Sequence, residues 1–226
     1  MKNAASMTVI VVGAGIAGLA TAWSLLKSGH KVTIVEQGPI PNPLAASGDH
    51  HRIIRRAYPS GSGYGRLITE AYLAWDALWA DLGESHLDAR GFLCISREPG
   101  DEAEDYRKGL QDGGYPFELF QPEVAVARYP FLEANSFRYA YFSPEGGALH
   151  CRKIAAGLAG WLRANGANVY EHSRVAEIDT ENGHVTLEGR ATMHADRIVV
   201  TAGAWVLKLF PELGGDLATY RTALAY

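Results

Sequence analysis

Hydrophobic and polar positions at the start of the chain follow two different periods, one after the other. Residues 8–12 are an unbroken run of Thr, Val and Ile, which predicts a strand buried on both faces. Apolar side chains then recur at helical spacing over 19–26, and Ser28-Gly29 is a typical helix end. A second run rich in β-branched residues covers 31–35. The pattern predicts a βαβ unit.

The turn between the first predicted strand and the helix carries glycines in the spacing GxGxxG. Gly13 permits a tight turn, Gly15 lets a phosphate approach the backbone, and Gly18 lets the helix pack closely on the strand. Glu36, at the tip of the second strand, can accept hydrogen bonds from an adenosine ribose and would repel the 2′-phosphate of NADP. These features predict a site for an ADP-containing cofactor, FAD or NAD; the alternative is an ordinary glycine-rich αβ turn.

The rest of the chain alternates between helical, strand and loop patterns. A Pro-rich loop covers 37–50 and leads into a charged block at 47–61. Residues 113–144 are punctuated by prolines and predict short strands and turns, an inserted piece of a second domain. The further predicted elements are helices over 66–82, 101–110, 152–165 and 205–210, strands over 91–96, 169–170 and 198–200, a hairpin around Asn182-Gly183, and a strand beginning near Ala218.

Composition narrows the class of protein without changing this picture. The 226 residues are 47% hydrophobic and 20% charged, which is ordinary for a globular protein. A formal net charge of −4 without a basic run argues against nucleic acid as a partner. Cys94 and Cys151 lack a CxxC spacing, so neither a disulfide scaffold nor metal or redox chemistry is predicted. No stretch is long and apolar enough to span a bilayer, and a cytoplasmic location is expected.

Three segments together carry a resemblance to a known family. The opening GxGxxG with Glu36, the block GDHHRIIRRAY (48–58), and the pair RVAEID (174–179) and RIVVTAGAW (197–205) resemble the amine and amino-acid oxidoreductases of the D-amino-acid-oxidase superfamily. The monomeric sarcosine oxidase and N-methyltryptophan oxidase group is most similar. The resemblance implies an α/β fold with a Rossmann-like FAD-binding domain and an inserted α+β substrate domain, the C-terminal part of the family fold being absent.

The resemblance also implies which residues belong to each domain and to the cofactor site. It places the FAD-binding domain at 1–84 and 145–212, and part of the substrate-binding domain at 85–144 and 213–226. FAD, rather than NAD, is the implied cofactor. The implied cofactor-binding residues are Gly13, Gly15, Gly18, Glu36, Gln37, Ser47, Arg52, Ile53, Val175, Thr201, Ala202, Gly203 and Trp205, with Val175 contacting adenine through its backbone.

In the family, the first arginine of an RxxR pair lies against the flavin and the second binds the substrate carboxylate. Arg52 and Arg55 match these two positions. A fixed cation near the flavin makes it a better hydride acceptor, and a guanidinium offers a bidentate fork to a carboxylate. The alternative is a solvated basic loop, and for Arg56 a surface role is expected. The family usually has one residue fewer between the GD pair and the arginines. Tyr58 either lines the substrate site or packs structurally.

No metal site is expected, because the adjacent His50 and His51 on a loop lack further ligands. The resemblance implies oxidation of the C–N bond of an amino acid or N-alkyl amino acid, by hydride transfer to flavin N5 and hydrolysis of the imine. Two alternatives stay open: a non-catalytic FAD-binding half, and an NAD(P)H-using flavin hydroxylase. The family's oxygen-activating lysine and last flavin-binding strand have no counterpart before Tyr226. A second polypeptide carrying the C-terminal portion is therefore an expected partner, beside the small-molecule substrate; the alternative is that the chain is a fragment of a longer product.

Overall fold

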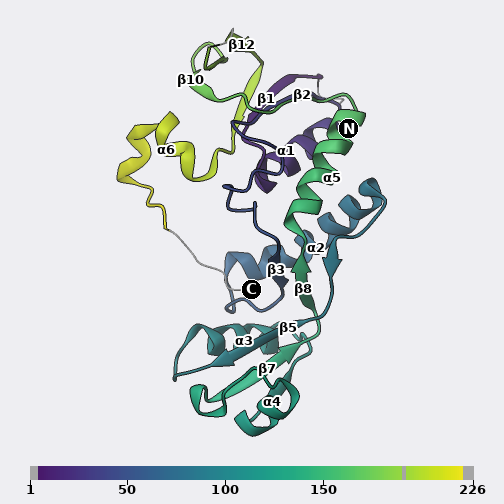
Figure 1. Cartoon of the computed structure of the whole chain (residues 1–226), viewed down its shortest axis with the longest axis vertical. Coiled ribbons are helices and arrows are strands. Elements are labelled where there is room, and N and C mark those ends of the chain that lie inside the picture. The colour runs from purple at the N-terminus through teal and green to yellow at the C-terminus, as the bar shows by residue number, and fades with distance from the viewer. Residues whose placement is uncertain (1–4, 190–191, 221–226) are drawn as a thin grey trace. The chain divides into compact units, whose positions relative to one another are not determined.

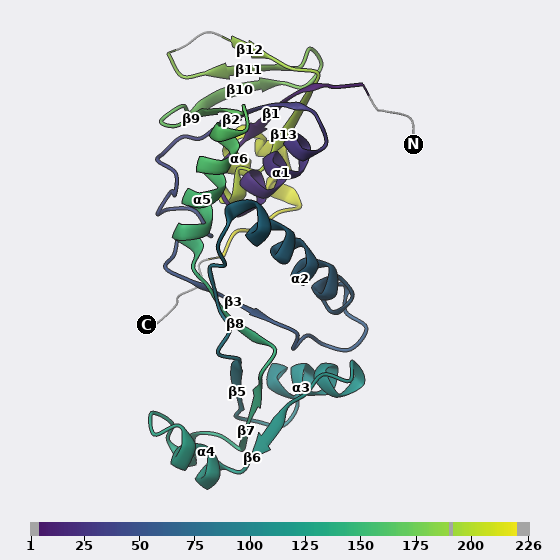
Figure 2. The same ribbon diagram turned by 90° about the vertical axis from the view of Figure 1, so that its right-hand side faces the viewer.

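The computed structural model describes residues 5–189 and 192–220. The chain divides into two compact units, Met1–His50 with Cys151–Tyr226, and His51–His150. Both are drawn in Figures 1 and 2, and each is described by itself. The first unit is therefore discontinuous in sequence, and the second is inserted into it.

The first unit is built on a four-stranded parallel sheet in the order β13-β1-β2-β9. A three-stranded antiparallel sheet, β10-β11-β12, is drawn beside it in Figure 2. The elements of this unit are β1 (Thr8–Val12), α1 (Ile16–Lys27), β2 (Lys31–Val35), α5 (Cys151–Ala164), β9 (Asn168–Tyr170), β10 (Val175–Asp179), β11 (His184–Leu187), β12 (Thr192–His194), β13 (Arg197–Val200), the 3₁₀ turn η2 (Gly203–Trp205), α6 (Val206–Leu209) and η3 (Pro211–Gly215).

Strand β1 is buried on both faces, which explains its unbroken hydrophobic sequence. Ile10 and Val12 pack in one core with the apolar side chains of the β10-β11-β12 sheet. Because side chains alternate along a strand, Val9 and Val11 point to the other face, where α1 and α5 pack beside each other. The register pairs the last residue of β1, Val12, with the last residues of β2 and β13, so the three carboxyl ends lie at one edge.

The second unit contains two three-stranded antiparallel sheets, β3-β8-β4 and β5-β7-β6. Helix α3 packs on β5, and its buried Leu110 shares a core with Phe92 and Tyr141. The elements of this unit are β3 (Arg52–Arg55), α2 (Gly63–Leu82), β4 (Leu87–Asp88), β5 (Phe92–Ser96), α3 (Glu102–Asp112), β6 (Glu118–Phe120), α4 (Pro122–Arg128), the 3₁₀ turn η1 (Ala134–Ser136), β7 (Tyr139–Ser143) and β8 (Gly146–Leu149).

Most predicted elements are confirmed, including the opening βαβ unit and the hairpin around Asn182-Gly183. Two expectations were wrong. Residues 113–144 include the helix α4, which begins at a proline; proline is tolerated there because the first-turn N–H has no helical partner anyway. The alternative interpretation of the arginines as a solvated loop does not hold for residues 52–55, which form strand β3 and pair with β8. Residues 218–220 form no strand, and the remainder of that expectation, 221–226, lies outside the described residues.

The boundaries of the compact units differ from the predicted domain boundaries. The units divide at 50/51 and 150/151, whereas the predicted FAD-binding domain included residues up to 84 and from 145. Helix α2 and strand β8 thus belong to the compact unit that contains the inserted segment. Compactness does not test which residues bind each ligand, so the domain assignment stays a prediction.

Neither Cys94 nor Cys151 forms a disulfide within the described residues. Over the described ranges, the structure contains no helix that is long and apolar enough to cross a membrane.

Candidate functional site

The glycine-rich turn joins the carboxyl end of β1 to α1 and is closed by contacts that leave no room for side chains at two positions. Gly13 has a φ of 101°, and a Cβ there would lie 2.7 Å from the carbonyl oxygen of Thr201. A Cβ at Gly18 would collide with the carbonyl oxygen of Gly13 and lie 2.6 Å from the Thr201 hydroxyl. At Gly15 the only neighbour within 4 Å would be the hydroxyl of Ser47, at 3.5 Å. The turn therefore has no room for a side chain at Gly13 or Gly18, whereas the space beside Gly15 is open enough for a ligand to approach the backbone.

Thr201, directly after β13, holds this turn from the neighbouring strand. Its hydroxyl lies 2.9 Å from the carbonyl oxygen of Val12 and 3.0 Å from that of Gly13, and its N–H also donates to Val12. The residues that follow form the 3₁₀ turn η2, in which Gly203 has a φ of 54°. Ala202 precedes this turn and Trp205 ends it, half-buried. The predicted cofactor residues of this segment therefore lie at the edge where the parallel strands end.

The start of α1 suits an anion. Its N-cap, Gly15, has no side chain to cap it, and its first turn contains no acidic residue, so the positive end of the helix dipole is not compensated from within the helix. The N–H of Ile16 donates to the hydroxyl of Ser47 at 3.0 Å, which brings Ser47 to the same place. An open glycine beside an uncompensated helix start fits the pyrophosphate of a dinucleotide.

Glu36 is buried, with 5% of its surface exposed, and its carboxylate is already well coordinated. It accepts hydrogen bonds from the N–H groups of Ala14 (2.8 Å) and Gly38 (2.9 Å) and from the amide of Asn42 (2.9 Å). A carboxylate has about four acceptor positions, so about one is left for a ribose hydroxyl. The buried Asn42 was not predicted; it lies in the Pro-rich loop, and its sequence carries no signal for this contact.

Two further predicted cofactor residues lie apart from the glycine turn in sequence. Gln37 follows Glu36 and is half-buried. Val175 begins β10, pairs with Leu187 of β11 and sits beside an irregularity in the register that precedes Glu177. Such a break leaves backbone groups outside the ladder, as a backbone contact to a ligand requires.

Strand β3 separates the two arginines of the RxxR pair. Side chains alternate along a strand, so residues three apart, Arg52 and Arg55, point to opposite faces. The exposures of the two residues between them agree, since Ile53 is 60% exposed and Ile54 is 6% exposed. A guanidinium nitrogen of Arg52 lies 3.5 Å from the carbonyl oxygen of His51. The sequence spacing placed both arginines in one segment, but it did not show that they face different surroundings.

Arg55 is held by aromatic rings. Its guanidinium carbon lies 4.1 Å from the ring centre of Tyr106 and 5.2 Å from those of Tyr58 and Phe92. Among the residues that the structure describes, Arg55 forms no ion pair with a carboxylate. The rings fix the guanidinium through cation–π contacts and leave its in-plane donors to another group. Tyr58 is a direct neighbour of this cation.

Arg56 occupies a different environment. As the surface interpretation expected, it is paired with a nearby acid, but its side chain is less exposed to solvent than a surface role implies. Its side chain is 17% exposed and forms an ion pair with Glu145. It lies over the rings of Tyr72 (4.5 Å) and Tyr115 (4.8 Å). Burial raises the pKa of Tyr72, although the positive charge of Arg56 opposes the shift. Of these two adjacent arginines, Arg56 is therefore paired with a carboxylate, whereas Arg55 has no such partner among the described residues.

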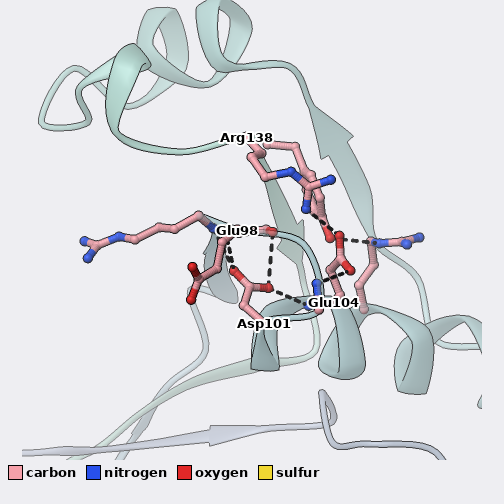
Figure 3. Close-up of polar contacts among 9 residues, drawn as sticks. Glu98, Asp101, Glu104 and Arg138 are labelled. Carbon is pink, nitrogen blue, oxygen red and sulfur yellow. Dashed lines mark hydrogen bonds and ion pairs between the residues drawn. The ribbon is translucent and has the colours of Figure 1, made fainter.

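The position of Tyr106 depends on the way α3 begins. Asp101 caps the helix by accepting from the N–H of Glu104 at 3.1 Å, and it also accepts from the N–H of Arg97 and the hydroxyl of Ser96 (Figure 3). Burial alone would raise the pKa of Asp101, but these backbone hydrogen bonds lower it overall. Arg138 of the segment before β7 donates to Glu104 at 2.6 Å. The start of α3 is therefore tied to both β5 and β7.

His50 and His51 lie at the junction between the two compact units. In the described part of the chain, no group of three or more His, Cys, Asp or Glu side chains could hold a metal ion.

The chain is similar in sequence to a family of flavin-dependent enzymes. The profile of a family described as FAD dependent oxidoreductase (DAO) matches residues 8–224. The chain is 27% identical over 211 residues to N-methyl-L-tryptophan oxidase of Yersinia pestis (strain Pestoides F), an alignment that covers 91% of this chain and 56% of that protein. The same values hold for the enzyme of that name from Yersinia pseudotuberculosis serotype O:1b (strain IP 31758). The chain thus spans little more than half the length of these relatives.

Solved structures support the fold. NikD, described as an unusual amino acid oxidase essential for nikkomycin biosynthesis, matches in its open form with a TM-score of 0.80 at 24% identity, over 93% of this chain and 55% of that chain. Glycine oxidase from Geobacillus kaustophilus matches with a TM-score of 0.76 at 23% identity, over 93% and 59%. These likenesses confirm the predicted fold class.

Proposed function

Because this chain belongs to the DAO family of FAD-dependent oxidoreductases, we propose that it binds FAD and oxidises the C–N bond of an amino acid or N-alkyl amino acid. FAD supplies the acceptor for the hydride that leaves the carbon beside the amine, and water hydrolyses the resulting imine. N-Methylated amino acids are included because the aligned relatives are named N-methyl-L-tryptophan oxidase. The chain spans 56% of those relatives, so the proposal concerns its contribution to the whole reaction.

The cofactor end of the proposal rests on the edge of the parallel sheet. The pyrophosphate would lie at the start of α1, beside Gly15 and Ser47. The backbone is accessible there, and the positive end of the helix dipole favours an anion. Glu36 would use its remaining acceptor position for the ribose, while its other hydrogen bonds hold the carboxylate in place. Thr201 would act through the turn that it holds, and Ala202, Gly203 and Trp205 would line the cofactor. Gln37, Ile53, Val175 and Arg52 complete the proposed set.

The single observation that carries the substrate end is the unpaired cation of Arg55. A half-buried guanidinium with three aromatic neighbours and no carboxylate partner in the described residues is a site for an external anion. The carboxylate of an amino acid has the geometry for a bidentate pair with it. Arg55 would orient the substrate, and Tyr58, Phe92 and Tyr106 would limit the access of water to the pair.

Substitution of Arg55 tests this proposal. With FAD bound, Arg55→Ala should raise KM for a carboxylate substrate about 10- to 100-fold, because a charge-assisted hydrogen-bonded pair is worth roughly 1.5–3 kcal/mol. FAD should stay bound, as judged by its absorbance. Arg90→Ala is the control, since Arg90 has an 87% exposed side chain in the same unit and should leave KM unchanged. Equal KM values for wild type and Arg55→Ala would remove Arg55 from the substrate site.

A second candidate function is that of an FAD-binding portion that needs a further polypeptide for turnover. The observation that favours it is the coverage of only 56% of the length of the aligned relatives. Anaerobic mixing of the FAD-loaded chain with a panel of amino acids separates the candidates. Bleaching of the flavin band by an amino acid supports the oxidoreductase. Bleaching only after the segment matching the rest of the relatives is supplied supports the second candidate, and bleaching by NADPH alone would indicate a flavin hydroxylase.

A further inference from the structure

Two consecutive arginines at the end of β3, Arg55 and Arg56, meet different partners. The register pairs Arg55, the last residue of β3, with Gly146, the first residue of β8. Glu145 directly precedes Gly146 and so lies just beyond the end of this ladder. There Arg56 and Glu145 form an ion pair.

The Arg56–Glu145 pair is fixed from both sides. The guanidinium carbon of Arg56 lies 4.5 and 4.8 Å from the ring centres of Tyr72 and Tyr115, and Arg56 donates to the hydroxyl of Thr69 at 3.2 Å. On the other strand, a Cβ at Gly146 would lie 2.9 Å from the carbonyl oxygen of Ile54, so β8 approaches β3 closely beside Glu145. The acidic group is thus held near the strand that carries Arg55.

We propose that Arg56 is a positioning residue that masks Glu145, so that Arg55 keeps its charge free of acidic partners and open to the carboxylate of the substrate. This inference rests on the proposed function of Arg55. Without Arg56, the carboxylate of Glu145 would be uncompensated near the substrate site and would repel a bound anion. Without Glu145, the site would gain one uncompensated cation. The two single substitutions therefore have opposite electrostatic consequences, which a purely structural role of the pair would not produce.

The experiment measures the dissociation constant of benzoate, and of neutral benzamide, for the FAD-loaded chain by titration calorimetry. We expect Arg56→Met to weaken benzoate binding about three- to tenfold, because it leaves the negative charge of Glu145 uncompensated and only partly screened by water. Glu145→Gln should leave benzoate binding equal or tighter. The double variant Arg56→Met/Glu145→Gln should bind benzoate within about twofold of wild type, and Arg56→Lys likewise. Benzamide binding should be the same in all variants. The benzoate effect should shrink at 1 M NaCl, where the screening length is about 3 Å.

A matched control is the Arg138–Glu104 ion pair of the same unit, whose side chains are 40% and 30% exposed. Arg138→Met and Glu104→Gln should not change benzoate binding. The inference is overturned if Arg56→Met and Glu145→Gln weaken benzoate binding alike, if the double variant does not recover, or if benzamide responds as benzoate does. Failure of the proposed function looks different: wild type would not bind benzoate, or Arg55→Ala would bind it as wild type does. A variant that does not fold is replaced by Arg56→Lys, which keeps the positive charge, and Arg56→Gln, which removes it and stays polar.

Discussion

At the scale of single residues, the same residue type serves different purposes because its surroundings differ. Arg55 and Arg56 are adjacent, yet one is stacked on rings without an acid and the other is paired with Glu145. Glycine shows the same dependence on place. Gly18 lies where a Cβ would collide with backbone, whereas a Cβ at Gly160 of α5 would meet nothing within 4 Å. The contacts of each residue in the folded chain, rather than its type, therefore determine what it does.

Gly18→Ala should destabilise the chain by about 1–3 kcal/mol, because the new Cβ forces the glycine turn away from Thr201. FAD binding should weaken with it, since the same turn forms the proposed pyrophosphate site. Gly160→Ala is the matched control: it adds a Cβ in open space within a helix and should stabilise by about 0.5–1 kcal/mol. Thermal unfolding and FAD titration of both variants check this. Retention of wild-type stability by Gly18→Ala would contradict the close packing of the turn.

At the scale of secondary-structure elements, strands and caps place the side chains of the proposed substrate site. The alternation of β3 separates Arg52 from Arg55, and the pairing of Arg55 with Gly146 of β8 brings the neighbouring Glu145 to Arg56. Helix α3 carries Tyr106 to the guanidinium of Arg55, and the capping hydrogen bonds of Asp101 fix where that helix begins. The cap therefore helps to place Tyr106 beside the guanidinium of Arg55.

The cap makes part of the stability depend on pH. The pKa of the Asp101 carboxyl is lowered in the folded state, so its ionised form stabilises folding above the unfolded pKa of about 3.9. This contribution is lost as the pH falls through the lower folded pKa. Asn caps a helix about as well as Asp, so Asp101→Asn removes the charge and keeps the cap. We expect its melting temperature to be below that of wild type at pH 7, and the two values to converge as the pH falls through the lowered folded pKa.

The control for this comparison is Asp105→Asn, which changes a carboxylate in the same helix that does not cap it. A constant difference in melting temperature between wild type and Asp101→Asn from pH 7 to pH 2 would show that the Asp101 charge does not contribute.

At the scale of the whole molecule, the second unit is an insertion whose two ends come together. Residues 51–150 enter and leave on paired strands, because Arg52 of β3 is opposite Leu149 of β8. Just outside, the N–H of Cys151 donates to the carbonyl oxygen of His50 at 3.2 Å. The unit has apolar cores of its own, one of them around the fully buried Tyr141. Adjacent ends and a separate core are the usual conditions for an inserted domain.

We therefore expect residues 51–150, produced alone, to fold into a unit with cooperative thermal unfolding and a near-ultraviolet circular dichroism signal from packed aromatics. The matched control is Tyr141→Ala in the same segment, which should cost about 3–5 kcal/mol by emptying the core, and should abolish the cooperative transition. A segment that binds hydrophobic dyes and lacks a near-ultraviolet signal would contradict an independent core.

The sequence by itself determined the parts of this protein that depend on local chemistry. The GxGxxG spacing, the continuous apolar strand and Glu36 sufficed to predict the βαβ unit, since turn conformation and strand burial are properties of short segments. Only the tertiary structure decided which contacts those residues make. The pairing of β3 with β8 brought Glu145 to Arg56, whereas Arg55 has no carboxylate partner within the described residues, and the folding back of the Pro-rich loop brought Asn42 to Glu36. Arg56 and Glu145 are distant in sequence, and the Asn42 contact depends on the path of the loop, so no local pattern encodes either contact.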